Sequence, residues 1–337
     1  MQRYVTSQKS AAAWRHNPPM GEFDLIARYF TRPVHRAALG VGDDCALLVP
    51  AAGMQLAVSS DMLVEGRHFF ADVDPEALGH KALAVNLSDL AACGARPLAF
   101  TLALALPRVD EPWLAGFSRG LLALADAHGC ELVGGDTTQG PLNICITVFG
   151  EVPAGHALLR SGARAGDELY VSGTLGDARL ALEALLGHTP VAPEVLAAAR
   201  QRLERPTPRV ALGLALRGVA SSAMDVSDGL LGDLSHILKA SGVGARIDTS
   251  LTAALMAHAG AAAGPEQLHQ CTLAGGDDYE LAFTAPPSQR AAVAAAAQAS
   301  QTPVARIGVI EAEPGLRLVD GQGQPVDKRY ASFDHFG

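Results

Sequence analysis

Segments with the spacing of β-strands alternate with segments of helical spacing along most of the chain. The expected strands are at 55–60, 98–106, 143–152, 168–171, 223–226, 281–284 and 304–310. The expected helices are at 21–30, 75–92, 111–128, 194–216 and 291–299, with two more beginning at Asp177 and just after Ser227. Alternation of this kind predicts an α/β or α+β protein, in which helices cover the faces of sheets.

The chain is long enough for two domains. At 337 residues it exceeds the usual size of a single hydrophobic core. Pro153-Ala154-Gly155 is the best candidate boundary, because it follows a strand and is suited to a turn. We therefore expect an N-terminal domain at 21–152 and a larger α/β domain at 153–337. Residues 1–20 are basic and contain no acid, so they are expected to be a disordered extension, although they faintly resemble a transit peptide.

Composition excludes several classes of function. The net charge is −9 and there are only four lysines, so a nucleic-acid-binding surface is not expected. No apolar run is long and clean enough to span a bilayer. The five cysteines form no C-x-x-C pair, which indicates reduced thiols and a cytoplasmic location rather than a disulfide framework.

Acidic residues recur directly after very small residues, close to where strand-like runs end. The five segments are Gly40–Asp44, Ser59–Asp61, Gly134–Asp136, Met224–Asp228 and Gly275–Asp278. Small residues allow a backbone to approach a ligand closely. Carboxylates are ligands that Mg²⁺ prefers. Because the pattern occurs five times, it predicts a site that holds several Mg²⁺ ions against a polyphosphate.

Each acidic segment taken alone also has a simpler explanation. Asp44 could belong to a solvated turn, and Asp136 to a tight hairpin. Asn86 and Asp89 are three residues apart on an expected helix and therefore share a face, which could be either a solvated turn or a functional surface. The recurrence, rather than any single segment, favours function.

The segment around Ser227 is harder to explain by structure alone. Ser227 is expected to cap the helix that follows it, which accounts for Ser227 and one neighbouring acid. It does not account for both Asp225 and Asp228. His68 is either a histidine satisfied near the core or a substrate contact, and it has no partner at zinc-ligand spacing.

Phosphate binding, if present, must use an unusual set of groups. The chain has no G-x-x-x-x-G-K-[ST] loop and no protein-kinase catalytic loop. Metals, arginines and backbone N–H groups remain as candidates. The Gly-rich turn at 172–176, between a strand and a helix, could present such N–H groups.

Several segments together carry a recognisable pattern, which resembles the thiamine-monophosphate kinase family over residues 21–336. The segments are GEFDLIARYF, GVGDDCALL, SSDMLVEGRHF, KALAVNLSDLAACGARP, LVGGDTT, RSGARAGDELYVSGTLGDA, MDVSDGLLGDL, GGDDYEL and FDHF. They occur in the same order as in that family, which belongs with aminoimidazole ribonucleotide synthetase to a larger group.

The resemblance implies a fold and a reaction. The fold would be the PurM-like two-domain architecture, with an α+β N-terminal domain, a larger α/β C-terminal domain, and N-terminal domains that pair into a barrel in a homodimer. The reaction would use ATP to convert thiamine monophosphate to thiamine diphosphate. Direct in-line transfer, assisted by several Mg²⁺ ions, would join two mutually repelling anions.

The resemblance also implies roles for individual residues. Those that would hold Mg²⁺ are Asp44, Ser59, Ser60, Asp61, Asp89, Asp136, Asp225 and Asp228. The six aspartates among them would form the catalytic set. Those that would contact ATP are Gly135, Asp136, Arg160 and Ser227. Those that would contact thiamine monophosphate are His68, Asp277 and Phe333.

Three positions depart from the family pattern. Asp277 stands where Glu is frequent, Phe333 where Tyr is frequent and Ser60 where Thr is common. None of these removes a metal carboxylate. Two alternatives remain open at this point: another ATP-using enzyme of the aminoimidazole ribonucleotide synthetase group, and a non-catalytic sensor of nucleotides or thiamine phosphates.

Overall fold

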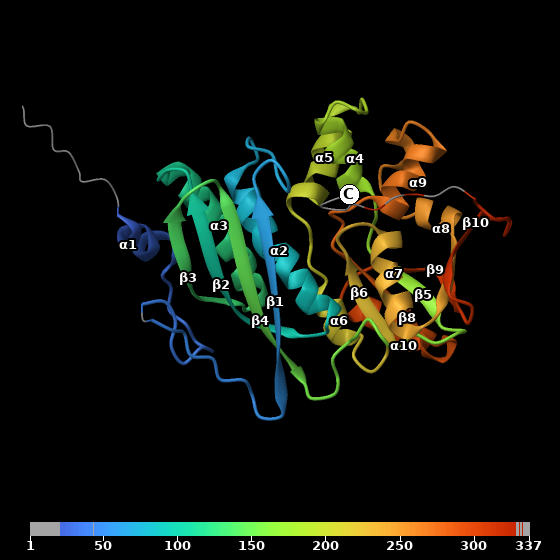
Figure 1. The fold of residues 1–337 in the computed structure, drawn as a ribbon, viewed down its shortest axis with the longest axis horizontal. Coiled ribbons are helices and arrows are strands. Elements are labelled where there is room, and N and C mark those ends of the chain that lie inside the picture. Colours follow the sequence, from blue (N-terminus) through green and yellow to red (C-terminus); the bar gives the residue numbers. More distant parts are fainter. Residues whose placement is uncertain (1–20, 43, 328–329, 331, 333–337) are drawn as a thin grey trace, which may run out of the picture.

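Two sheets with their helices lie side by side, one from each half of the chain (Figure 1). The computed structural model describes residues 21–42, 44–327, 330 and 332. The expectations for residues 1–20 and for Phe333 lie outside this range. Within the described residues, no helix combines the length and the apolar character needed to cross a membrane.

The N-terminal half is built on a four-stranded sheet in the order β1-β4-β2-β3. Its strands are β1 (Met54–Val64), β2 (Arg96–Leu106), β3 (Glu131–Gln139) and β4 (Asn143–Pro153). β2 and β3 run parallel, and the other neighbours are antiparallel. Its helices are α1 (Glu22–Leu25), a π-helical turn (Ile26–Phe30), α2 (Pro75–Ala92) and α3 (Glu111–His128). The long helices α2 and α3 cover one face of the sheet (Figure 1).

The C-terminal half is built on a six-stranded sheet in the order β10-β7-β9-β5-β8-β6. Its strands are β5 (Glu168–Ser172), β6 (Ser222–Val226), β7 (Gly244–Asp248), β8 (Glu280–Ala285), β9 (Val304–Glu311) and β10 (Gly315–Val319). Its α-helices are α4 (Asp177–Leu185), α5 (Pro193–Glu204), α6 (Val210–Ala215), α7 (Leu230–Ser241), α8 (Thr249–Ala253), α9 (Pro265–Ala274) and α10 (Arg290–Ala299). Two short 3₁₀ turns occupy Ala259–Ala261 and Pro287–Gln289.

Helix α2 lies at the boundary of the two halves and is buried nearly all around. The Asp74 side chain caps its first turn by accepting a 2.8 Å hydrogen bond from the Ala77 N–H. One side of α2 packs on α3 and the N-terminal sheet, and the other meets α6, β6 and β8. Because α2 has buried residues on nearly all of its sides, it is stable only when other elements enclose it in this way.

Close backbone approach explains two glycines in the α2–α3 pair. A Cβ atom added at Gly79 would clash with the Phe117 carbonyl oxygen, and one added at Gly120 would clash with the Glu76 carbonyl oxygen. Any larger residue would therefore force the helices apart. The tight pair fixes α2 against the sheet.

The two-part α/β architecture expected from the sequence is confirmed, and most elements lie where they were expected. The helices at 75–92 and 111–128 have the expected bounds. The first strand is longer than expected, because β1 continues through 61–64, so Asp61 lies inside it rather than after its end. The strand β3 was not among the expected strands, and Asp136 lies inside it rather than in a turn. The segments β7, β10, α8 and α9 were not anticipated either.

Candidate functional site

Two acidic side chains of the N-terminal half meet where β1 crosses α2. Ser59 Oγ donates a 2.5 Å hydrogen bond to Asp89 Oδ2. Two residues along the strand, the N–H of Asp61 donates to Asn86 Oδ1 at 3.1 Å. The helix face that carries Asn86 and Asp89 therefore packs on β1. This packing brings the side chains of Asp61 and Asp89 close together.

The C-terminal half contributes a third and a fourth acid. Asp225 lies near the end of β6, and its Oδ2 accepts a 2.7 Å hydrogen bond from Ser88 Oγ on α2. Asp228 follows in the adjoining loop. Both side chains line a cavity of about 230 Å³ together with Asp61 and Asp89. Four carboxylates, from β1, α2, β6 and the loop after β6, thus line one space between the halves.

Burial and mutual repulsion raise the pKa values of these acids. Burial, followed by the charges of Asp89 and Asp228, raises the pKa of Asp61 to about 6. Burial, followed by the charge of Asp89, raises the pKa of Asp225 to about 8. Burial also raises the pKa of Asp89, although its hydrogen bond from Ser59 acts in the opposite direction. A cation brought into this space would relieve the repulsion.

The loop at the start of α7 is organised differently from the expectation. Ser227 does not cap the helix, because Gly229 occupies the N-cap position. Instead Asp233 Oδ2 accepts the N–H groups of Ser227, Asp228 and Gly229 at 2.9, 3.0 and 3.1 Å. A carboxylate near the helix N-terminus replaces the cap and complements the helix dipole. Burial raises the pKa of Asp233 to about 7.

An arginine lies at the edge of the acidic group. Arg160 lines a second cavity, of about 350 Å³, with Ser59, Asp89 and Asp225. Its positive charge lowers the pKa of Asp89, in opposition to burial. The space is therefore bordered by carboxylates and by a guanidinium group, a combination that suits a metal-bound phosphate chain.

A separate group forms at the other edge of the N-terminal sheet. Asp44, Gly135 and Asp136 line a cavity of about 620 Å³ beside β3. β3 and β1 are opposite edges of the sheet. Within one chain, the structure therefore divides the six predicted aspartates into a group of four and a group of two.

Strand parity also separates Ser60 from its neighbours. Ser60 Oγ lies 3.0 Å from Thr147 Oγ1, on the sheet face turned away from α2. Residues that are paired in register on neighbouring strands have their side chains on the same face of the sheet. The register pairs Asp136 with Ala103, Ala103 with Cys145 and Cys145 with Met62, so Asp136 shares a face with Met62. Met62 is two residues from Ser60 on β1 and therefore lies on the same face as Ser60. Ser60 and Asp136 therefore lie on this second face, which we call the open face.

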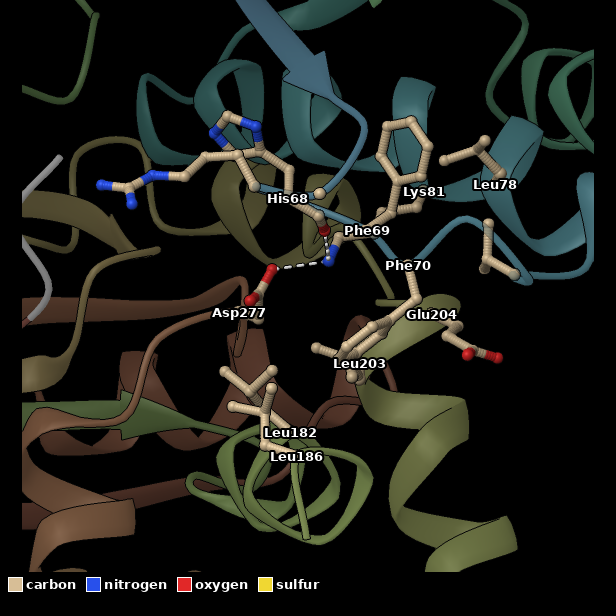
Figure 2. Close-up of a pocket in the computed structure, with 13 residues that line it drawn as sticks. His68, Phe69, Phe70, Leu78, Lys81, Leu182, Leu186, Leu203, Glu204 and Asp277 are labelled. Atoms are coloured by element: carbon tan, nitrogen blue, oxygen red, sulfur yellow. Dashed lines mark hydrogen bonds and ion pairs between the residues drawn. The ribbon is translucent and has the colours of Figure 1, made fainter. Parts of the chain in front are cut away.

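An apolar cavity of about 250 Å³ adjoins the acidic one, and both are lined by Arg67, His68, Leu182 and Asp277. Leu182 and Leu186 face the segment that carries His68 across the apolar cavity (Figure 2). His68 Nδ1 accepts the Val64 N–H at 3.0 Å, so its protonated nitrogen in the neutral ring is Nε2. Asp277 forms a 2.7 Å ion pair with Lys81.

The other two acids of the 277–280 segment have structural roles. Glu280 is fully buried and pairs with Arg202 and Arg209 at 2.7 and 2.6 Å. Asp278 Oδ1 accepts the Gly176 N–H at 2.9 Å. Counterions and a backbone donor thus stabilise acids that would otherwise be costly to bury.

Three N–H groups of the Gly-rich turn, which the sequence offered as phosphate donors, are already used inside the protein. The Gly176 N–H is bound to Asp278. The N–H of Gly173 donates to the Pro303 carbonyl at 2.8 Å, and that of Leu175 to Leu255 at 3.3 Å. These donors anchor the turn inside the protein.

Sequence reasoning missed several residues of the site. Ser88 and Lys81 lie on α2, and Arg67 and Arg179 line the acidic cavity. Lys81 is the one lysine, arginine, aspartate or glutamate in the stretch 77–87, and this was the available signal, because an isolated charge on a buried helix requires a partner. Its partner could not be identified without coordinates.

Comparisons with known proteins agree over nearly the whole chain. Residues 42–152 match the family "AIR synthase related protein, N-terminal domain", and residues 164–321 match the corresponding C-terminal domain family. The chain is 49% identical over 325 residues to the thiamine-monophosphate kinase of Salmonella typhimurium, which covers 94% of this chain and 98% of that protein.

Solved structures give the same result. The crystal structure of thiamine-monophosphate kinase from Stenotrophomonas maltophilia is 45% identical, with a TM-score of 0.80, over 90% of this chain and 95% of that one. A structure described as AaThiL complexed with AMPPCP and TMP is 30% identical, with a TM-score of 0.73, over 86% of this chain and 89% of that one.

Proposed function

Because the chain belongs to the thiamine-monophosphate kinase family, we propose that it transfers the γ-phosphoryl group of ATP to thiamine monophosphate, giving ADP and thiamine diphosphate. One observation carries this proposal beyond the family assignment. A cavity lined by four carboxylates opens directly beside an apolar cavity, and the two share Arg67, His68 and Asp277. This arrangement offers adjoining spaces for a metal-bound phosphate chain and for an organic acceptor.

The acidic cavity is the proposed place of ATP and Mg²⁺. Ser59, Asp61, Asp89, Asp225 and Asp228 would hold the ions. Among the described residues, no group of three or more His, Cys, Asp or Glu side chains is already arranged to hold a metal. That fits Mg²⁺, which takes one or two carboxylates, substrate phosphates and water rather than an all-protein cage. Burial and the neighbouring carboxylates raise the pKa of Asp61 and of Asp225, and a bound cation would oppose both effects.

The proposed chemistry is in-line attack by a phosphate oxygen of thiamine monophosphate on the γ-phosphorus of ATP. When bound, Mg²⁺ would neutralise charge on both phosphate groups. The acceptor phosphate is ionised near neutral pH, so no strong general base is needed. The remaining task of the chain is to orient the two substrates, with Arg160 and Ser227 bordering the ATP side.

The apolar cavity is the proposed place of the acceptor's rings. Leu78, Leu182, Leu186 and Leu203 line it, and His68 and Asp277 stand where it joins the acidic cavity. His68 and Asp277 would therefore contact the acceptor between its rings and its phosphate. Phe333, the third proposed contact, lies outside the described residues.

A homodimer is proposed to complete the site. Among the described strands, β1 pairs with β4 alone and β3 with β2 alone, so both edges are open. Leu56, Val58 and Met62 on the open face of β1 are 45%, 57% and 52% exposed. Pairing of N-terminal sheets would cover these edges and side chains. It would also bring the Asp44, Gly135 and Asp136 group of one copy towards β1 of the other.

A cytoplasmic location is proposed as well. All five cysteines are free thiols, and two of them, Cys130 and Cys271, are buried. Burial raises the pKa of both to about 12, so they are inert in the folded chain. This usage fits a reducing compartment.

Direct assay tests the proposed function. The protein is incubated with ATP, MgCl₂ and thiamine monophosphate, and thiamine diphosphate is measured by chromatography. ADP should form in step with thiamine diphosphate and only when thiamine monophosphate is present. Release of ADP with another acceptor alone would indicate a different enzyme of the group, and binding of both substrates without turnover would indicate a sensor.

A further inference from the structure

Lys81 and Asp277 form an ion pair across the boundary of the two halves (Figure 2). Lys81 Nζ lies 2.7 Å from Asp277 Oδ1 and donates a second hydrogen bond, of 3.3 Å, to the His68 carbonyl oxygen. Lys81 belongs to α2, whereas Asp277 lies in the loop between α9 and β8. One ammonium group therefore joins the two segments that carry the proposed acceptor contacts.

The lysine is buried to an extent that requires such partners. Its side chain is 3% exposed, and that of Asp277 is 30% exposed. Burial of an ammonium group is unfavourable unless it is paired and hydrogen-bonded. Lys81 meets this requirement on the wall of the apolar cavity, beside Leu78 and Phe69.

The backbone at Asp277 is held in an unusual conformation. Asp277 has φ +65° and Tyr279 has φ +50°, in the left-handed region that non-glycine residues seldom adopt. The Asp277 N–H donates to the Ser227 carbonyl and the Tyr279 N–H to the Val226 carbonyl, both at 2.8 Å. These two hydrogen bonds hold the loop of Asp277 against the segment that follows Asp225. The ion pair with Lys81 then holds the Asp277 side chain.

The ion pair with Lys81 also distinguishes Asp277 from the other carboxylates of the site. Asp61, Asp89, Asp225 and Asp228 line the acidic cavity together with two arginines, Arg67 and Arg179. Asp277 stands at the same cavity but is compensated by the ammonium of Lys81. A compensated carboxylate is a poorer ligand for Mg²⁺, yet it can still accept a hydrogen bond from an organic group.

We propose that Lys81 is a positioning residue for the acceptor. It holds the carboxylate of Asp277 and the main chain of His68 in place across the domain boundary. It also directs Asp277 to the organic acceptor rather than to metal. This inference rests on the proposed function, in which Asp277 contacts thiamine monophosphate.

A second ion pair between the halves provides a matched control. Arg205 lies 3.5 Å from Glu76 Oε1, linking the end of α5 to α2. Neither residue lines the acidic or the apolar cavity. Arg205→Met therefore removes a bridge between the halves without touching the proposed site.

Steady-state kinetics of Lys81→Met test the proposal. We expect the KM for thiamine monophosphate to rise about 10-fold or more while the KM for ATP changes less than about twofold. Lys81→Arg, which keeps the charge, should recover much of the loss. Arg205→Met should leave both KM values unchanged. Because Lys81 acts through Asp277, the double variant Lys81→Met/Asp277→Asn should be no worse than Asp277→Asn alone.

Other outcomes overturn the proposal. Equal changes in both KM values, or additive losses in the double variant, would show that Lys81 serves only the fold. If Lys81→Met does not fold, as judged by circular dichroism, Lys81→Gln and Lys81→Arg are compared instead, and equal KM values for thiamine monophosphate in these two would reject the role of the charge. Absence of thiamine diphosphate from the wild-type reaction would refute the proposed function, whereas normal wild-type turnover with an unchanged Lys81→Met would refute this inference alone.

Discussion

Ser88 in the C-terminal half of α2 donates a 2.7 Å hydrogen bond to Asp225 on β6, so a helix of one half directly holds an acidic side chain of the other. The bond also lowers the pKa of Asp225 against the larger effect of burial. The serine thus favours the ionised form, which is the form that binds metal.

Replacing Ser88 by Ala should weaken the use of Mg²⁺. The lost bond to a buried carboxylate is worth about 1.5–3 kcal/mol, and its loss raises the pKa of Asp225 further. We expect a higher Mg²⁺ concentration for half-maximal turnover, with a larger defect at pH 7 than at pH 9. Ser118→Ala on α3 removes another buried serine and should leave the Mg²⁺ titration unchanged. Identical titrations for both variants would contradict this role.

Asp61→Asn should separate activity from stability. Loss of a proposed metal ligand should reduce kcat by roughly 100-fold or more. In Mg²⁺-free buffer the melting temperature should rise, because the charge of Asp61 is disfavoured by burial and by Asp89 and Asp228. Turnover measurements check the loss of activity, and thermal melts check the gain in stability.

Asp126→Asn is the control, because it changes an exposed acid paired with Arg32, and it should retain full turnover. Near-normal turnover of Asp61→Asn would show that Asp61 is not a metal ligand.

The stabilisation by Mg²⁺ should depend on pH. Burial and neighbouring carboxylates raise the pKa of Asp61 to about 6 and that of Asp225 to about 8, above the ordinary value for an aspartate. Between pH 4 and pH 8 the folded state therefore binds more protons than the unfolded state, so the metal-free protein loses stability as the pH rises through this window. Mg²⁺ should offset this loss.

Thermal melts with and without MgCl₂ at pH 5, 6.5 and 8 measure the effect. The increase in melting temperature on adding MgCl₂ should be smallest at pH 5 and largest at pH 8. Asp225→Asn should flatten the dependence. The same increase at every pH would argue that the ions bind elsewhere.

Val58→Asp should disrupt the proposed dimer. Val58 is 57% exposed on the open face of β1, where a charge would face the partner sheet. Light scattering after gel filtration should show a dimer for the wild type and a monomer for the variant, with lower turnover. Val109→Asp places a charge at another exposed valine, 47% exposed, and should stay dimeric. A monomeric wild type with full activity would exclude the dimer from the mechanism.

The sequence predicted the elements of this fold well where a periodic pattern and its end signals agree. Pro75 and Gly94 mark the ends of α2, and Gly129, with φ +58°, ends α3. The prediction was weaker where a residue further along the chain binds the N–H groups at the start of a helix. Ser227 has the chemistry of an N-cap, yet Gly229 occupies the N-cap position, and Asp233 Oδ2 in the first turn of α7 accepts the N–H groups of Ser227, Asp228 and Gly229.

The candidate site could be predicted only as a set of residue types. Small residues beside acids indicated Asp61, Asp225 and Asp228, and helical spacing with Asn86 indicated Asp89. These four carboxylates do share a cavity. The position of Asp136 relative to the other acids could not be predicted from the sequence. It depends on the order of the strands and on the side of the sheet to which each residue points, and these place Asp136 on the opposite edge and on the open face. In the proposed homodimer, Asp136 of one copy would approach β1 of the other.

The enclosure of α2 has a consequence for how this protein can vary. Asn86, Ser88 and Asp89 each contact a different partner, on β1 or β6, and Lys81 reaches the loop after α9. Insertion of one residue before Lys81 would turn all four side chains by about 100° around the axis and break every contact at once. Homologous chains should therefore tolerate changes of length in the surrounding loops but preserve the spacing within this helix.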